Sequence, residues 1–261
     1  MNNRHWKYLL VPSFCGFLIF YIIPFFHSLS YAWVNDAFNQ EFCGLQNFKN
    51  LFSSEYFILG MKNTLLFTAT SVPLILIISY IIAYLLAFVA RKLIFSHSAI
   101  FLPYLLPSIT AIMIWQTYFT SLPEFSSLLL LFLWKYTGLN VILLTASFLT
   151  VPQEILDSAQ IDGASPSRTL IHILLPNSIP MLLFTSILSF VNSFQIYRES
   201  YLLWGNYPSK NVYMIQNYLN NHFEKLNYQN VSSAATIFFL GIFLIVSGLL
   251  WCEKKWSDQI W

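Results

Sequence analysis

The chain has 261 residues, of which 57% are hydrophobic, 18% are aromatic and only 9% are charged. A soluble domain usually devotes roughly a quarter of its residues to Asp, Glu, Lys and Arg, so this composition excludes a soluble globular chain. The net charge of +2 and the lack of a Lys/Arg cluster exclude a nucleic-acid-binding surface.

Six apolar stretches are long enough to cross a bilayer, which requires around 20 residues of helix. They lie at residues 8–30, 64–90, 98–119, 128–150, 181–203 and 234–252. We therefore predict an all-α integral membrane fold, with six transmembrane helices in a single domain over residues 1–261. The first stretch runs too long for a signal peptide and lacks a small-residue cleavage site, so we interpret it as a retained span.

The fourth stretch is the weakest, because Lys135, Gly138 and Asn140 interrupt it. Polar positions within a span are tolerated where they face protein instead of lipid. Lys135 lies within about two helical turns of the outer edge, so we expect its amine to reach the interface. Lining a solute path or pairing with Glu199 are the alternatives.

The distribution of basic residues predicts the orientation of the chain. With a cytoplasmic N-terminus, the inner segments hold Arg4, Lys7, Arg91, Lys92, Arg168, Lys254 and Lys255. The outer loops then hold four lysines, namely Lys49, Lys62, Lys210 and Lys225. We therefore expect a multi-pass protein of the cell membrane, with both termini and the segment 151–179 in the cytoplasm.

The cytoplasmic segment predicts two short amphipathic helices joined by a tight bend. In the first, Pro152 suits the first helical position, Glu154 places an acid in the first turn and Gly163 is a C-terminal stop. Its apolar residues near one face are Ile155, Ala159 and Ile161.

The second helix begins with Ser165 as N-cap and Pro166 at its first position, and Pro176 is expected to end it. One interpretation of the pair is an interfacial element lying on the bilayer, but such helices are usually rich in Lys and Arg. Here the polar face carries Glu154, Asp157 and Asp162 but only one basic residue, Arg168. This acidic balance favours docking into a protein socket.

This segment resembles the "EAA" coupling loop of permease subunits from binding-protein-dependent ABC importers. That pattern runs E-A-A, three residues, G, nine residues, I-x-L-P. Here it reads Asp157-Ser158-Ala159, Gly163, then Ile173-Leu174-Leu175-Pro176, with every spacing kept. The departures are Asp for Glu at 157 and Ser for Ala at 158. Asp162-Gly163 followed by Ala164-Ser165 is typical of the carbohydrate-uptake branch.

The resemblance extends along the chain and implies a set of partners. These are a second permease subunit, two ATPase subunits and an extracytoplasmic solute-binding protein. It also implies that the loop's first helix seats in a cleft of the ATPase, with Asp157 pairing with a basic group there. No G-x-x-x-x-G-K-[ST] loop occurs in the chain. ATP and Mg²⁺ are therefore expected on the ATPase subunits, with no cofactor bound directly.

Polar residues recur along one face of the fifth span, where Asn192, Gln195 and the Arg198-Glu199 pair are spaced by three or four residues. Amides, together with Tyr197 and Tyr201, suit hydroxyl groups and sugar-ring faces. This pattern indicates part of a solute path. Alternatively, Asn192 bonds a neighbouring helix, Arg198 reaches the interface, or Arg198 and Glu199 contact the docked solute-binding protein.

No catalytic site is indicated, because H-E-x-x-H and G-x-S-x-G are both missing and the five histidines lack metal-ligand spacing. A secondary transporter would favour acidic residues within its spans, yet Glu199 alone lies there. The sequence therefore predicts a non-catalytic permease subunit for a sugar or sugar derivative. A non-sugar solute is the alternative.

Overall fold

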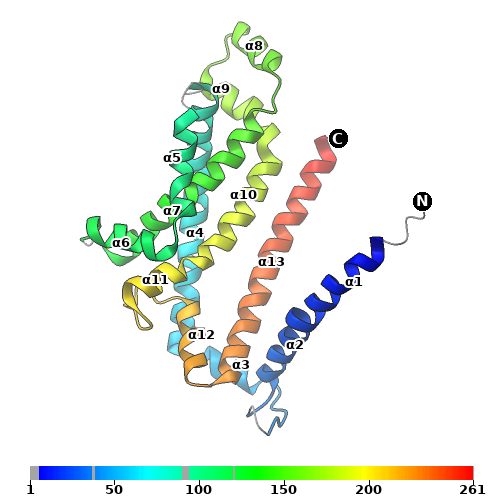
Figure 1. Ribbon diagram of the computed structural model, residues 1–261, viewed down its shortest axis with the longest axis vertical. Coiled ribbons are helices and arrows are strands. Elements are labelled where there is room, and N and C mark those ends of the chain that lie inside the picture. Colours follow the sequence, from blue (N-terminus) through cyan, green and yellow to red (C-terminus); the bar gives the residue numbers. More distant parts are fainter. Residues whose placement is uncertain (1–5, 37–38, 90–93, 120, 261) are drawn as a thin grey trace. The chain divides into compact units, whose positions relative to one another are not determined.

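The computed structural model describes residues 6–36, 39–89, 94–119 and 121–260 (Figure 1). Over these residues the chain is helical apart from turns, loops and one isolated antiparallel bridge between Val34 and Phe42. The chain divides into two compact units. Unit 1 comprises Met1–Gly60 and Ile215–Ile242, and unit 2 comprises Met61–Met214 and Phe243–Trp261.

The spans agree with the prediction in number. Within the described residues, five helical segments are long and apolar enough to cross a membrane, and a bent helix pair counted as one span makes six. The five segments are Leu10–Trp33, Glu55–Phe88, Glu124–Phe148, Pro166–Trp204 and Tyr228–Cys252. Arg4 and the Arg91-Lys92 connection, which contribute to the predicted orientation, lie outside the described residues.

Unit 1 is built from helices that pack through aromatic contacts, and the buried amide of Asn47 joins two of its elements. Its elements are α1 (Trp6–Phe17), η1 (Leu18–Ile22), α2 (Ile23–Ser30), η2 (Tyr31–Trp33), α3 (Gln46–Phe52), α12 (Ile215–Glu224) and the first part of α13 (Tyr228–Ile260). The rings of Phe25 and Phe239 pack edge to face, with centroids 5.2 Å apart. Asn47 Nδ2 donates to the carbonyl oxygens of Ala32 and Val34, which fixes α3 against the end of the first span.

Unit 2 contains the remaining elements, and α7 (Glu124–Phe148) lies at its centre, packed against α5 and α10. The others are most of α4 (Glu55–Tyr84), η3 (Leu85–Val89), α5 (Ile94–Leu105), α6 (Ser108–Tyr118), α8 (Gln153–Ile161), α9 (Pro166–Thr169), η4 (Leu170–Leu174), α10 (Leu175–Gln195), α11 (Tyr197–Trp204) and the second part of α13. The polar interruptions of the fourth span face protein, as predicted. Asn140 Nδ2 donates to Ser189 Oγ of α10 at 2.7 Å.

The third span, predicted over residues 98–119, is not one straight helix, because it bends by 113° between α5 and α6. Pro107 causes the break: its backbone is extended (φ −55°, ψ 144°). A proline also disfavours helical geometry in the residue before it, here Leu106. Ser108 therefore begins a new helix, α6, which packs against α11.

The predicted stop at Pro176 is wrong, since α9, η4, α10 and α11 form one continuous apolar run over Pro166–Trp204. A π-helical turn, η4, precedes the proline, and Leu175 N–H donates to Leu170 O across it. Asn177 Nδ2 donates to Ile173 O, a carbonyl near the point where the proline lacks an N–H. The same arrangement occurs in the first span, where η1 precedes Pro24. Wide turns and side-chain amides let these helices pass a proline.

Candidate functional site

The loop between the fourth and fifth spans is a helix followed by a glycine turn, and it projects from one end of unit 2 (Figure 1). Helix α8 starts at Gln153, with Pro152 preceding it as N-cap and not as its first residue. Gly163 has φ +74°, Gly163 N–H donates to Gln160 O, and Ala164 N–H donates to Ala159 O. These two bonds form a Schellman motif, in which glycine adopts the left-handed conformation at no steric cost. The predicted stop at Gly163 is confirmed.

The next helix starts as predicted. Ser165 is the N-cap of α9, and its Oγ accepts a hydrogen bond from the Arg168 N–H at 3.4 Å. Pro166 follows at the first helical position, where its missing N–H costs nothing. Two helix ends are therefore fixed by local bonds within a few residues of Gly163, which makes the bend stiff.

Leu156 is the one buried residue of α8 and packs this helix against the rest of unit 2. Its side chain is 6% exposed and belongs to a buried cluster with residues from α4, η3, α7 and η4. The other members are Ala83, Leu86, Ala87, Val141, Leu144, Phe148, Val151 and Leu174. Of the apolar residues predicted near one face, Ile155 and Ile161 are exposed and Ala159 is half-buried, so they do not pack against unit 2 as Leu156 does. Gln153 and Gln160 lie on the same side of the helix as Leu156. Because both are polar, the sequence has no apolar stripe there that would have predicted the burial of Leu156.

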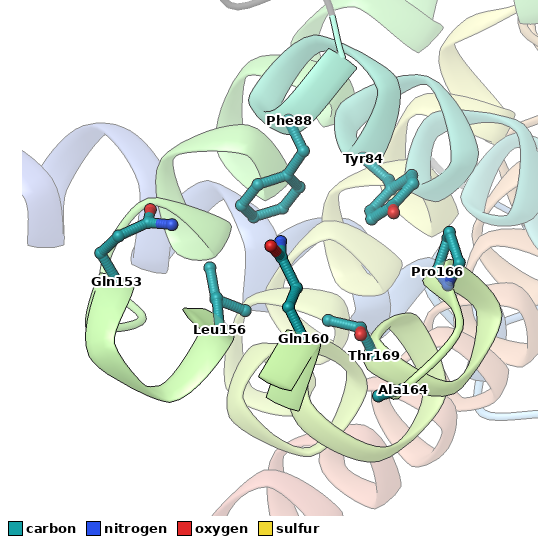
Figure 2. A pocket seen from close by; sticks show the side chains of 8 residues that line it. All are labelled: Tyr84, Phe88, Gln153, Leu156, Gln160, Ala164, Pro166 and Thr169. Carbon is teal, nitrogen blue, oxygen red and sulfur yellow. The ribbon is translucent and has the colours of Figure 1, made fainter. Parts of the chain in front are cut away.

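Beside Leu156 lies a cavity of about 310 Å³, shown in Figure 2. Tyr84 and Phe88 line it from α4 and η3, and the loop residues face them. The loop residues are Gln153, Leu156, Gln160, Ala164, Pro166 and Thr169. The cavity lies between α8 and the end of the second span beside the Leu156 contact, so α8 is tethered there and not fully packed.

The predicted contact residues of α8 are turned outward. Glu154, Asp157, Ser158, Asp162 and Gly163 are exposed, and Ala159 is half-buried. Asp157 Oδ1 accepts a hydrogen bond from Gln153 Nε2 at 2.9 Å, and Ser158 Oγ donates to Glu154 O. The acidic side of the loop is therefore open to a partner. At the far end of the motif, Ile173 and Leu175 are half-buried and Pro176 is exposed.

A second polar region surrounds the end of the fifth span. Asn192 and Gln195 line a cavity of about 450 Å³ in unit 2, as expected from their shared helical face. The cavity's other lining residues are Tyr104, Leu105, Leu106, Pro107, Ser108, Lys135, Tyr136, Arg198 and Glu199. Tyr197 and Tyr201 are not among them and pack against each other, with ring centroids 5.9 Å apart. They lie one helical turn apart on α11, whereas Arg198 and Glu199 of the same helix line the cavity.

Lys135 does not reach the interface, and that expectation is wrong. Its side chain is buried and forms an ion pair with Glu199, whose side chain is fully buried. Lys135 Nζ also donates to Ser108 Oγ at 3.1 Å, and Ser108 Oγ donates to Glu199 Oε1 at 2.7 Å. Three helices, α6, α7 and α11, meet at this cluster.

The chain matches known proteins over nearly its whole length. Residues 9–251 match the model of the family described as "Binding-protein-dependent transport system inner membrane component". A "Probable ABC transporter permease protein" of Mycoplasma genitalium is 29% identical, over 96% of this chain and 89% of its own length. The arabinooligosaccharides transport system permease protein of Bacillus subtilis is 26% identical, over 90% of this chain and 84% of its own.

Among solved structures, the fold resembles a bacterial alginate ABC transporter in complex with an alginate pentasaccharide-bound periplasmic protein. The TM-score is 0.76 at 19% sequence identity, over 98% of this chain and 94% of that one. This likeness shows the fold.

Proposed function

The chain belongs to the family of binding-protein-dependent transport system inner membrane components, and on that premise we propose that it imports a sugar or sugar derivative. In this proposal it is the non-catalytic permease subunit of an ATP-driven importer. It forms half of the translocation path beside a second permease subunit. Two ATPase subunits supply ATP and Mg²⁺, and an extracytoplasmic solute-binding protein delivers the solute. The transport systems named for its relatives, for arabinooligosaccharides among others, support a sugar as the solute.

The observation that carries this proposal is the loop around Gly163. Its end is exposed, acidic and held rigid by the Schellman turn and the Ser165 cap. A rigid projection suits docking into a socket, because little conformational freedom is lost on binding. Asp157 is the residue we expect to pair with a basic group of the ATPase.

Leu156 provides the mechanical link in this mechanism. It belongs to the same buried cluster as residues of α4 and α7, so a displacement of α8 is passed to two spans. Packed side chains transmit displacement because protein interiors have few voids. Nucleotide-driven movement of the ATPase would then bias the side towards which the spans open.

Solute would pass along the polar face of the fifth span. Asn192 and Gln195 offer amide donors and acceptors to the cavity of about 450 Å³, a volume typical of small-molecule sites. Tyr136 and Tyr104 contribute aromatic surface to the same cavity. Tyr197 and Tyr201, the other two predicted path residues, do not line this cavity and are not part of the proposed path.

The docking role is tested by Gly163→Asp. A side chain at this position meets no atom within 4 Å of its Cβ, so the fold is expected to persist. We expect the variant complex to remain in the membrane and its solute-stimulated ATP hydrolysis to fall to the unstimulated rate. The measurement is ATPase activity of the complex reconstituted with its solute-binding protein.

Gly205→Asp is the matched control, because Gly205 also has φ +74° and open space around its Cβ but follows α11. It likewise places an Asp at a positive φ, but away from the loop, and stimulation should be retained. Wild-type stimulation in Gly163→Asp would contradict the docking role.

A further inference from the structure

The ion pair between Lys135 and Glu199 joins helices that meet at the bend of the third span. Ser108 is the first residue of α6, Lys135 lies on α7 and Glu199 lies on α11. All three line the same cavity as Asn192 and Gln195. The cluster is therefore part of the cavity wall and not a distant structural contact.

The carboxylate of Glu199 is only half satisfied. An ionised carboxylate offers about four acceptor sites on its two oxygens. Oε1 accepts from Lys135 and Ser108, whereas Oε2 is buried and has no hydrogen-bond partner among the described residues. An unpaired buried acceptor is costly, because its interactions with water are lost without replacement.

Stability alone gives no reason to keep this pair. Well-packed apolar residues often replace a buried ion pair without loss of stability. A functional role explains both the retained charges and the unpaired oxygen. Lys135 fixes Oε1, which leaves Oε2 as the oxygen still lacking a partner and free to bond a donor that arrives in the cavity.

The surrounding side chains indicate the kind of donor. Asn192 and Gln195 present amides to the cavity, and Tyr104 and Tyr136 present ring surface. Amides with aromatic surface and a carboxylate acceptor suit a ligand that carries several hydroxyl groups. A cation is a poorer match, because Lys135 and Arg198 give the cavity's charged residues a net charge of +1 when Glu199 is counted.

We propose that Glu199 is a specificity-determining residue that accepts a hydrogen bond at Oε2 from a hydroxyl of a polyhydroxylated solute, with Lys135 and Ser108 as positioning residues. This inference rests on the proposed function, since it names a contact along the same solute path. A site built to bind a hydroxyl strongly rejects an analogue that lacks it, because the acceptor is then left unpaired.

The experiment compares three variants in the complete reconstituted complex. Glu199→Gln keeps the shape and one acceptor. Lys135→Met with Glu199→Met removes both charges at similar volume. Lys135→Glu with Glu199→Lys restores an ion pair but exchanges the cavity's acceptor for a donor. Probes are arabinotriose and a guluronate trisaccharide, one neutral and one acidic polyhydroxylated solute, and the readouts are assembly, unstimulated ATP hydrolysis and the dependence of uptake on probe concentration.

Uptake is compared among the variants that assemble. Uptake efficiency should fall roughly 10- to 100-fold, as expected for the loss of a hydrogen bond to a charged group. The charge exchange should not rescue it. Ser200→Ala is the control, because Ser200 is a buried neighbour on α11 that does not line the cavity, and uptake should be unchanged.

Recovery of uptake in the charge-exchanged or double-Met variant would assign the pair to structure and overturn the inference. Failure of all three variants to assemble would overturn it as well. The proposed function has a separate criterion, which is the wild-type complex. If neither probe, nor any other sugar presented by the solute-binding protein, stimulates the wild type, then sugar import itself is wrong.

Discussion

Gly138 decides how closely two spans approach. It lies on α7 against the backbone of α5, and a Cβ there would stand 2.1 Å from the carbonyl oxygen of Ile100 and 2.9 Å from Cα of Phe101. Both are backbone atoms, which cannot rotate away as a side chain can. Small residues allow such close helix contacts in membrane proteins. In the sequence alone, Gly138 is only an interruption of an apolar run.

We therefore expect Gly138→Ala to destabilise the protein by about 1–3 kcal/mol, the usual cost of overpacking a tight contact. The measurement is thermal unfolding of the detergent-solubilised protein.

Gly248→Ala provides the control, because Gly248 lies in α13 and a Cβ added there would meet no atom within 4 Å. It should be neutral or slightly stabilising, since alanine is the better helix former. An equal loss of stability in both variants would show that the α5 contact is not the cause.

At the scale of single elements, α8 depends on one apolar contact. Leu156 is buried, whereas its neighbour Ile155 is 46% exposed. The cavity beside Leu156 leaves the remainder of the helix without close packing against α4. Local opening of α8 should therefore be governed by this residue.

Leu156→Ala is expected to cost α8 about 2–5 kcal/mol of local stability, as is usual for truncating a buried leucine. Amide hydrogen exchange over Gln153–Ile161 should then accelerate at least roughly tenfold. Coupling between the ATPase and the spans should weaken at the same time, because a loosened α8 no longer moves together with α4 and α7.

Ile155→Ala removes a similar side chain from the exposed side of the same helix turn, so exchange there should change little. Equal acceleration in the two variants would mean that Leu156 is not the tether. Loss of ATPase coupling in Ile155→Ala with normal exchange would instead identify Ile155 as part of the docking surface.

At the scale of the whole molecule, the chain is a multi-pass membrane protein, and its orientation remains a prediction from basic residues. That prediction assigns Ser167 to the cytoplasm and Lys225 to the outside. Both side chains are exposed, so cysteines placed there would be reachable by a thiol reagent.

The test uses Ser167→Cys and Lys225→Cys, each in a background where Cys15, Cys43 and Cys252 are replaced by serine. In intact cells, a membrane-impermeant maleimide should label the cysteine at 225 and not the one at 167. Inside-out vesicles should give the reverse. Labelling of the 167 variant in intact cells would contradict the cytoplasmic loop, and with it the docking of an ATPase there.

Much of the fold could be predicted because it depends on neighbouring residues. A span needs only a run of apolar residues, and the helix stop at Gly163 and cap at Ser165 are made by bonds across a few positions. The exceptions are prolines. Pro107 breaks the third span, whereas Pro176 follows a π-helical turn and is carried within a continuous helix. The same residue type gives opposite outcomes according to how the freed backbone groups are satisfied.

The sequence by itself determined the class of protein, the number of spans and the local geometry of the loop, because apolar run length and helix-end chemistry are local. Only the tertiary structure decided that Lys135 pairs with Glu199, that Leu156 and not Ile155 is buried, and that Gly138 contacts α5. Lys135 and Glu199 are 64 residues apart in the chain. Whether a charge is neutralised within the protein or reaches the interface depends on which helix packs beside it. The spacing of residues along one helix does not identify that neighbouring helix.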